Sequence, residues 1–190
     1  MKIYPTNIRE QDHYLTEEIK EQCQKYLVPE SVNELTLGLS SVTAAFYGLS
    51  LQHISNEFGP EACKRISKKI FYDLGKMKAI QCKGKMPNFP FDTTAFALTT
   101  ITAIYTSNPE YVFTISEFTP NKTVLKLEGV DRYLKILKEL NIEDQIELPT
   151  LLGFMEGIND ELELGAEITF EIEVNEQENT TNTTYTFMKK

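Results

Sequence analysis

The sequence predicts an α+β fold, in which N-terminal helices precede a four-stranded antiparallel sheet that helices cover on one face. Two observations indicate this class. Apolar residues recur at helical spacing through most of residues 1–108, whereas residues 109–190 contain four stretches of alternating apolar and polar residues. With 190 residues, 41% of them hydrophobic, the chain can bury one core. We therefore expect residues 1–190 to form a single domain with a mostly helical part and a ββααββ part.

Helices are predicted over residues 14–27 and 37–59. The first ends before Pro29, because proline cannot continue a helix. The second has large apolar residues at helical spacing and small residues on its other faces, so we expect it to be central and buried. Ser31, followed three residues later by Glu34, has the form of a capping box.

Two more helices are predicted on either side of a loop. One covers residues 60–75, with Pro60 at its first position and Gly75 at its end. Residues 80–92 contain two prolines and a glycine, which indicates a loop or crossing segment. Residues 93–108 again show helical spacing, although their threonine content leaves a strand possible.

The apolar period changes after Pro109. Strict alternation on either side of short polar turns predicts two β-hairpins, and two short amphipathic helices separate them. The expected segments are, in order, the strands 111–118 and 123–129, the helices 131–141 and 149–162, and the strands 167–174 and 183–187.

Gly153 and Gly157 interrupt the predicted helix 149–162. Each glycine costs about 1 kcal/mol relative to alanine in a helix interior. We expect this helix to lie flat on the sheet, where the glycines let its backbone approach the sheet, a partner helix or a ligand.

The charge of the chain is unevenly distributed. A net charge of −9 argues against nonspecific nucleic-acid binding. Residues 64–85 nevertheless carry eight basic side chains and one acidic one. This segment is either a solvated helix face or a docking patch for an acidic protein partner or an anionic ligand, with Lys64, Arg65, Lys68 and Lys69 as its first basic residues.

Cellular targeting and disulfide signals are missing from the sequence. There is no apolar run of about 18 residues and no apolar core of a signal peptide, so we expect a cytoplasmic protein. The three cysteines are unclustered, which indicates neither a disulfide framework nor a zinc site.

A family resemblance rests on LLGFMEGINDEL, EITFEIEV and TYTF, with FGPEACKRISKKIFYDLG upstream. This order resembles the superfamily of vinyl-reductase-like small-molecule-binding domains, haem–nitric-oxide-binding domains and related transport-particle subunits. The resemblance implies an α+β fold that holds a small, often apolar ligand between helices and sheet, and a possible homodimer. The haem branch needs a proximal histidine and a Tyr-x-Ser-x-Arg motif. Only His13 and His53 are present and the motif is absent, so haem is disfavoured and no cofactor is predicted.

The resulting prediction is a noncatalytic sensory module that binds an apolar or aromatic ligand and signals through protein partners. The candidate ligand-binding residues are Phe46, His53, Phe89, Phe91, Phe96, Gly153, Phe154 and Gly157.

Two other function classes stay open. One is a small hydrolase or lyase that uses Cys82, Asp92 or Glu156 in the same pocket. A looser resemblance to aminothiazoline-carboxylate hydrolase-like proteins fits this class, but Val130 stands where a thiol is wanted. The other is a structural adaptor without a ligand, as in transport particles.

Overall fold

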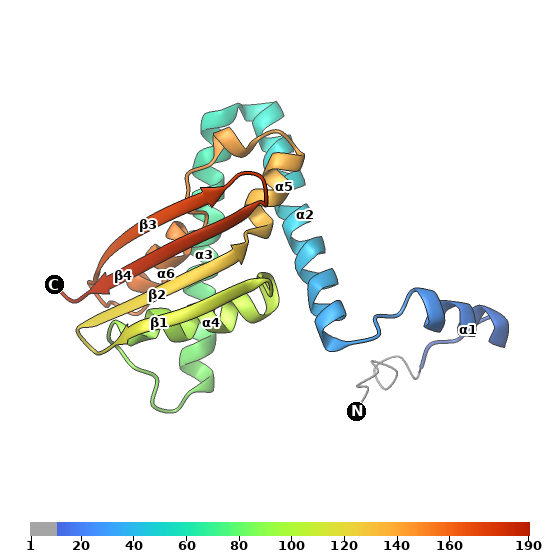
Figure 1. The fold of residues 1–190 in the computed structure, drawn as a ribbon, viewed down its shortest axis with the longest axis horizontal. Helices are drawn as coiled ribbons and strands as arrows, with labels where there is room; N and C mark the ends of the chain where they lie inside the picture. Colours follow the sequence, from blue (N-terminus) through green and yellow to red (C-terminus); the bar gives the residue numbers. More distant parts are fainter. Residues whose placement is uncertain (1–10) are drawn as a thin grey trace.

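The computed structural model describes residues 11–190. Within them, six α-helices and a short 3₁₀ helix accompany one four-stranded sheet, which confirms the α+β class (Figure 1). The helices are α1 (Glu17–Tyr26), α2 (Val32–Phe58), α3 (Pro60–Lys85), α4 (Thr94–Ser107), α5 (Arg132–Glu139), η2 (Glu143–Gln145) and α6 (Leu152–Glu161). The strands are β1 (Tyr111–Phe118), β2 (Lys122–Val130), β3 (Glu167–Asn175) and β4 (Thr180–Met188).

The two predicted hairpins join through their second strands. All neighbours are antiparallel and the strand order is β1-β2-β4-β3, with Leu125 opposite Tyr185 at the centre of the β2–β4 pair. Strand β1 contains a bulge between Ile115 and Glu117. Alternate residues of β2 and β4 are buried against α3, α4 and α6, which lie behind one face of the sheet (Figure 1). The other face is open, as the alternation predicts.

Helix α3 is longer than expected. It continues past Gly75 to Lys85, so the predictions of a helix end at Gly75 and of a loop from residue 80 are wrong. Gly75 lies inside the helix, at a point where the backbone of α6 comes close. A Cβ atom at Gly75 would come within 2.1 Å of the carbonyl oxygen of Phe154. The glycine therefore allows a close backbone contact and does not cap the helix.

Helix α2 begins at Val32, where the Oγ atom of Ser31 accepts a hydrogen bond from the Glu34 backbone N–H at 3.1 Å. This confirms that Ser31 caps the helix. The expectation that α2 is buried is wrong for one face. Tyr47 and Leu51 are buried, but Val42 and Phe46 on the other face are exposed, and α1 extends outward from the start of α2 (Figure 1).

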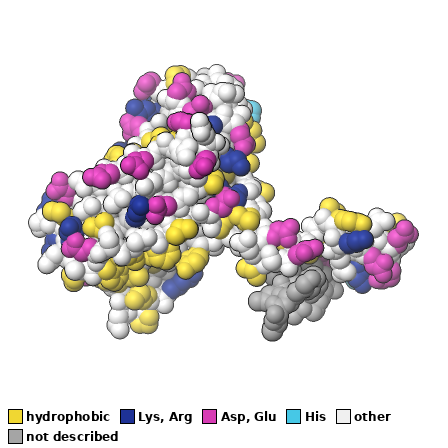
Figure 2. Space-filling model, viewed as in Figure 1, with side chains coloured by type: hydrophobic (Ala, Val, Ile, Leu, Met, Phe, Trp, Pro, Cys, Tyr) yellow, Lys and Arg dark blue, Asp and Glu magenta, His cyan; other side chains and the backbone are white. Residues whose placement is uncertain are grey.

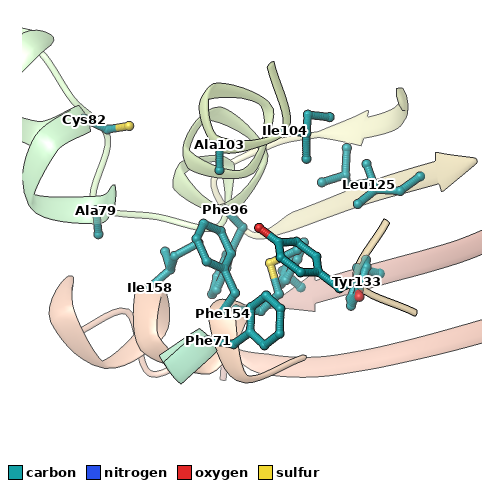
Figure 3. Packing of buried hydrophobic residues seen from close by; sticks show 14 of the residues in the cluster. Phe71, Ala79, Cys82, Phe96, Ala103, Ile104, Leu125, Tyr133, Phe154 and Ile158 are labelled. Carbon is teal, nitrogen blue, oxygen red and sulfur yellow. The ribbon is translucent and has the colours of Figure 1, made fainter. Parts of the chain in front are cut away.

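The core fills the layer between helices and sheet. Phe96 of α4 stacks on Phe187 of β4, with ring centroids 4.0 Å apart. Phe71 of α3 and Phe154 of α6 meet beside them (Figure 3). Among residues 11–190, no helix has the length and hydrophobicity needed to cross a membrane.

Candidate functional site

The glycines of α6 face α3, not the sheet. A Cβ atom at Gly157 would lie 2.0 Å from the carbonyl oxygen of Tyr72, and one at Gly153 would lie 2.8 Å from that of Lys68. Only glycine permits this separation, because any side chain would overlap the backbone of α3. The expectation that this helix lies flat on the sheet through its glycines is therefore wrong, whereas the alternative of a partner helix is confirmed. The contact fixes α6, whose buried Phe154 and Met155 complete the core.

The eight predicted ligand-binding residues lie in three different settings. Phe46 and His53 are exposed on α2, and Phe91 is exposed in the segment before α4. Phe89 is buried, with its ring in edge contact with Phe91 at 6.4 Å between centroids. The remaining four lie in the core or at the contact of α3 with α6: Phe96, Phe154, Gly153 and Gly157. The structure does not gather the eight around one hollow, and their ligand-binding role stays a prediction.

Three aromatic rings meet where α2, α3 and α5 pack together. Tyr47, Phe71 and Tyr133 contact one another edge to face, with centroids 5.1–5.3 Å apart. The Tyr47 hydroxyl lies 2.7 Å from Oγ of Ser67. Burial raises the pKa of both tyrosines, so their hydroxyls stay protonated and serve as neutral hydrogen-bonding groups.

Asp131 is a buried carboxylate beside this aromatic group. Its Oδ1 atom accepts hydrogen bonds from the backbone N–H groups of Tyr133 and Leu134 at 3.0 and 3.1 Å, and thus caps α5. Its Oδ2 atom accepts one from the Thr150 hydroxyl at 2.9 Å. Burial raises the pKa of Asp131, although these hydrogen bonds oppose that effect by favouring the charged form. The carboxylate is positioned to accept a further hydrogen bond from Tyr111.

A groove of about 380 Å³ opens at the β1 edge of the helix–sheet layer. Its walls come from the start of α2, the end of α4 and β1, and are formed by Val32, Asn33, Thr36, Ile104, Tyr105, Pro109, Tyr111 and Phe113. Most of these side chains are apolar or aromatic, and the volume lies in the range of small-molecule sites.

Tyr111 connects the groove to the interior. Tyr111 lines the groove, while its hydroxyl lies in the interior, 3.1 Å from Oγ1 of Thr181 on β4 and near the Asp131 carboxylate. Burial, and next the Asp131 carboxylate, raise the pKa of Tyr111 well above its ordinary value. Tyr111 therefore contributes to the mostly apolar wall of the groove, while its neutral hydroxyl lies in the interior beside a buried carboxylate.

The candidate catalytic residues lie apart from this groove. Cys82 is buried on α3, and Glu156 on α6 forms an ion pair with Lys68 at 3.1 Å. Asp92 accepts a hydrogen bond from the Thr94 backbone N–H at 2.9 Å, and thus pairs a backbone donor at the start of α4. Within residues 11–190, no group of three His, Cys, Asp or Glu side chains is placed to hold a metal ion.

The basic segment lies along α3, over an open hollow of about 710 Å³ on the surface. Acidic side chains interrupt it, in ion pairs that join Lys64 to Glu147, Lys68 to Glu156, Lys69 to Asp73 and Lys76 to Glu161 at 2.5–3.4 Å. These pairs lower the positive potential of the patch. Because they are partly exposed, each stabilises the fold by only about 0.2–1 kcal/mol.

Comparison with known proteins finds a similar fold among solved structures. No protein-family model matches the chain, and neither does any curated protein. The fold is similar to the crystal structure of the phenol-responsive sensory domain of the transcription activator PoxR with phenol. The TM-score is 0.52 over 76% of this chain and 74% of that chain, at 9% sequence identity. At this identity the similarity concerns the fold, which this chain shares with a sensory domain that responds to a small molecule.

The residues of the groove were missed by the sequence reasoning. Tyr105, Tyr111 and Phe113 lie in the predicted helix 93–108 and strand 111–118, and none of them is among the eight predicted ligand-binding residues. A signal was present for Asp131, because an aspartate directly before a short amphipathic helix is a typical N-cap. The predicted hairpin of strands 111–118 and 123–129 brings this cap near Tyr111, and the structure gives the register, with Tyr111 opposite Gly129.

Proposed function

We propose that this chain is a noncatalytic sensory module of the vinyl-reductase-like superfamily that binds a small apolar molecule with an aromatic ring, and that the ligand is not haem. The observation that carries the proposal is the groove at the β1 edge, where Tyr111 links an aromatic wall to buried Asp131. An apolar wall with one fixed polar group is the usual form of a site that orients a small aromatic ligand. The shared fold with a phenol-responsive sensory domain supports the same class of function.

The signal passes to other proteins through the surface. The patch on α3 remains a candidate surface for an acidic partner, with Arg65 beside the paired Lys64, Lys68 and Lys69. Ion pairs that are already formed on the patch must be exchanged for such a partner to bind, so we expect this association to be weak and sensitive to salt. Self-association offers a second route for the signal.

Titration with phenol and toluene, followed by calorimetry, tests the proposed site. Tyr105→Ala removes an aromatic wall of the groove, and Tyr26→Ala is its control because the two side chains are similarly exposed, at 65% and 69%. We expect the Tyr105 variant to bind phenol about 2–10-fold more weakly, which corresponds to one aromatic contact. The control should bind as the unaltered chain does.

Other results would contradict the proposal. One is that the unaltered chain binds neither phenol nor toluene. Another is that Tyr105→Ala and Tyr26→Ala weaken phenol binding equally. A haem Soret band in the absorbance spectrum of the freshly purified chain would contradict the proposal that the ligand is not haem.

A further inference from the structure

Within residues 11–190, helix α2 carries an apolar stripe that is exposed except at half-buried Leu35 and has the spacing of a coiled-coil seam. Its members follow one another at alternating intervals of three and four residues, and we call them the α2 stripe: Val32, Leu35, Leu39, Val42, Phe46 and Leu49. Leu39, Val42 and Phe46 are 58%, 69% and 76% exposed. An average period of 3.5 residues is typical of helices that pair along their length.

The opposite face of α2 fixes this orientation. Three residues of this face are buried in the body: Ala44, Tyr47 and Leu51. Gly48 packs against Ile136 of α5 so closely that a Cβ atom at Gly48 would lie 2.9 Å from the Ile136 side chain. The helix cannot rotate about its axis to bury the stripe without exposing these residues. The stripe therefore stays outside the core as long as the body is folded.

The part of α2 that carries the stripe is almost free of charged residues. From Leu35 to Asn56, α2 contains no Asp, Glu, Lys or Arg, although such residues make up 25% of the chain. Loss of charge marks the central part of protein interfaces. The flanking hydroxyls of Thr36, Thr43 and Ser50 donate hydrogen bonds to backbone carbonyls one turn earlier, at 2.7–2.9 Å, and thus need no water.

The segment before the stripe also lacks a packing partner within residues 11–190. None of the ten residues of α1 is buried, and Leu15, Tyr26 and Leu27 are 69–90% exposed. Helices shorter than about 12–15 residues are marginal in water when they stand alone. Figure 2 shows the segment of α1 as an arm that leaves the body, with hydrophobic side chains along it.

We propose that a second copy of this chain covers the α2 stripe, so that two α2 helices pair along their stripes. A like chain is the best occupant because the 3.5-residue period matches itself. It also approaches without like-charge repulsion, since an overall charge of −9 would otherwise oppose self-association but no charge meets at this face. The uncharged region of 22 residues is about 33 Å long in a helix, enough for three heptads.

The pairing gives the self-association in the proposed function a location. Val32 begins the stripe and also lines the groove at β1, so an occupant of that groove would touch the first turn of the paired helix. The inference deepens the proposed function and rests on it only for this link. Pairing itself can be measured without any ligand, so a failure of one proposal is distinguishable from a failure of the other.

Sedimentation velocity of the full chain over a dilution series, without ligand, tests the pairing with two matched variants. Phe46→Asp places a charge in the stripe, whereas Phe58→Asp places one on the other side of the same helix at nearly equal exposure, 76% against 74%. We expect the unaltered chain and the Phe58 variant to be dimers. The Phe46 variant should dissociate about 100-fold more readily or more, because an unpaired carboxylate is costly in an apolar interface.

Three results would overturn the pairing: a monomeric unaltered chain at every concentration, a dimeric Phe46→Asp variant, or equal dissociation of both variants. Leu39→Asp repeats the test at a second position on the stripe. Far-UV circular dichroism and the thermal midpoint of each variant, measured under dilute conditions, show whether the body remains folded. A loss of dimer with an unfolded body in both stripe variants would count against a specific interface.

Discussion

Helices α6 and α2 each present an apolar face, but only that of α6 is covered by the described part of the chain, residues 11–190. The glycines of α6 contact the backbone of α3, with Gly157 so close that a Cβ atom would lie 2.0 Å from Tyr72 O. Gly38, on the outer part of α2, has open space around it. Both glycines cost the helix about 1 kcal/mol, but only α6 regains that cost from contacts within residues 11–190. The difference teaches that a glycine in an apolar helix indicates close packing without saying which chain supplies the partner.

The largest difference in stability between the core and the α2 stripe should appear on loss of an aromatic ring. Phe96→Ala removes a fully buried ring stacked on Phe187, so we expect the free energy of unfolding to fall by about 3–5 kcal/mol. Phe46→Ala should change it by less than about 0.5 kcal/mol, because the ring is 76% exposed. Urea unfolding at concentrations where the chain is monomeric measures both values. A similar loss of unfolding free energy in the two variants would mean that the α2 stripe packs within its own chain.

A smaller effect is expected at the contact of α3 with α6. Gly157→Ala forces the two backbones apart and should lower the free energy of unfolding by about 2–3 kcal/mol. Gly84→Ala is the control, because no atom lies within 4 Å of a Cβ atom at that position of α3. The control should stabilise the chain by about 0.5–1 kcal/mol through helix propensity alone. Thermal and urea unfolding give both signs, and a stabilising Gly157→Ala would contradict the close contact.

A further difference between interior and surface should depend on pH. Burial raises the pKa of Asp131 in the folded state above its ordinary value of 3.8, so the folded chain holds this proton more tightly than the unfolded chain does. The contribution of Asp131 to stability is therefore highest below pH 3.8 and falls as the pH rises through the folded-state pKa. Asp131→Asn cannot ionise and should lack this decline. Urea unfolding of both chains across that range tests it, and a difference that does not change with pH would contradict the raised pKa.

The smallest effect is expected on the charged surface of α3. Lys68→Ala breaks the ion pair with Glu156. The side chain of Lys68 is 49% exposed and that of Glu156 is 35% exposed. We expect the free energy of unfolding to fall by less than about 1 kcal/mol, and by less still at high salt. A urea titration at low and high ionic strength measures this. A loss as large as that of Phe96→Ala would show that the patch is part of the structural core.

Much of the fold could be predicted from local patterns. Alternation in residues 111–118 and 167–174 located β1 and β3, because a strand with one buried face imposes a period of two. The end of α3 was misplaced because Gly75 has the residue type of a helix terminator, and only its contact with Phe154 shows its role. Proximity of Asp131 to Tyr111 depends on the exact register of the β1–β2 hairpin, which places Tyr111 opposite Gly129, two residues before Asp131.

The sequence by itself determined which residues form helices and strands, and which faces of them are apolar. These properties depend on side chains a few positions apart, so a local pattern records them. Only the tertiary structure decided which apolar face is covered and by what. Once Tyr47 and Leu51 of α2 are buried in the body, the rigid geometry of the helix turns Phe46 outward. The same packing leaves a groove between α4 and β1 that no single segment encodes.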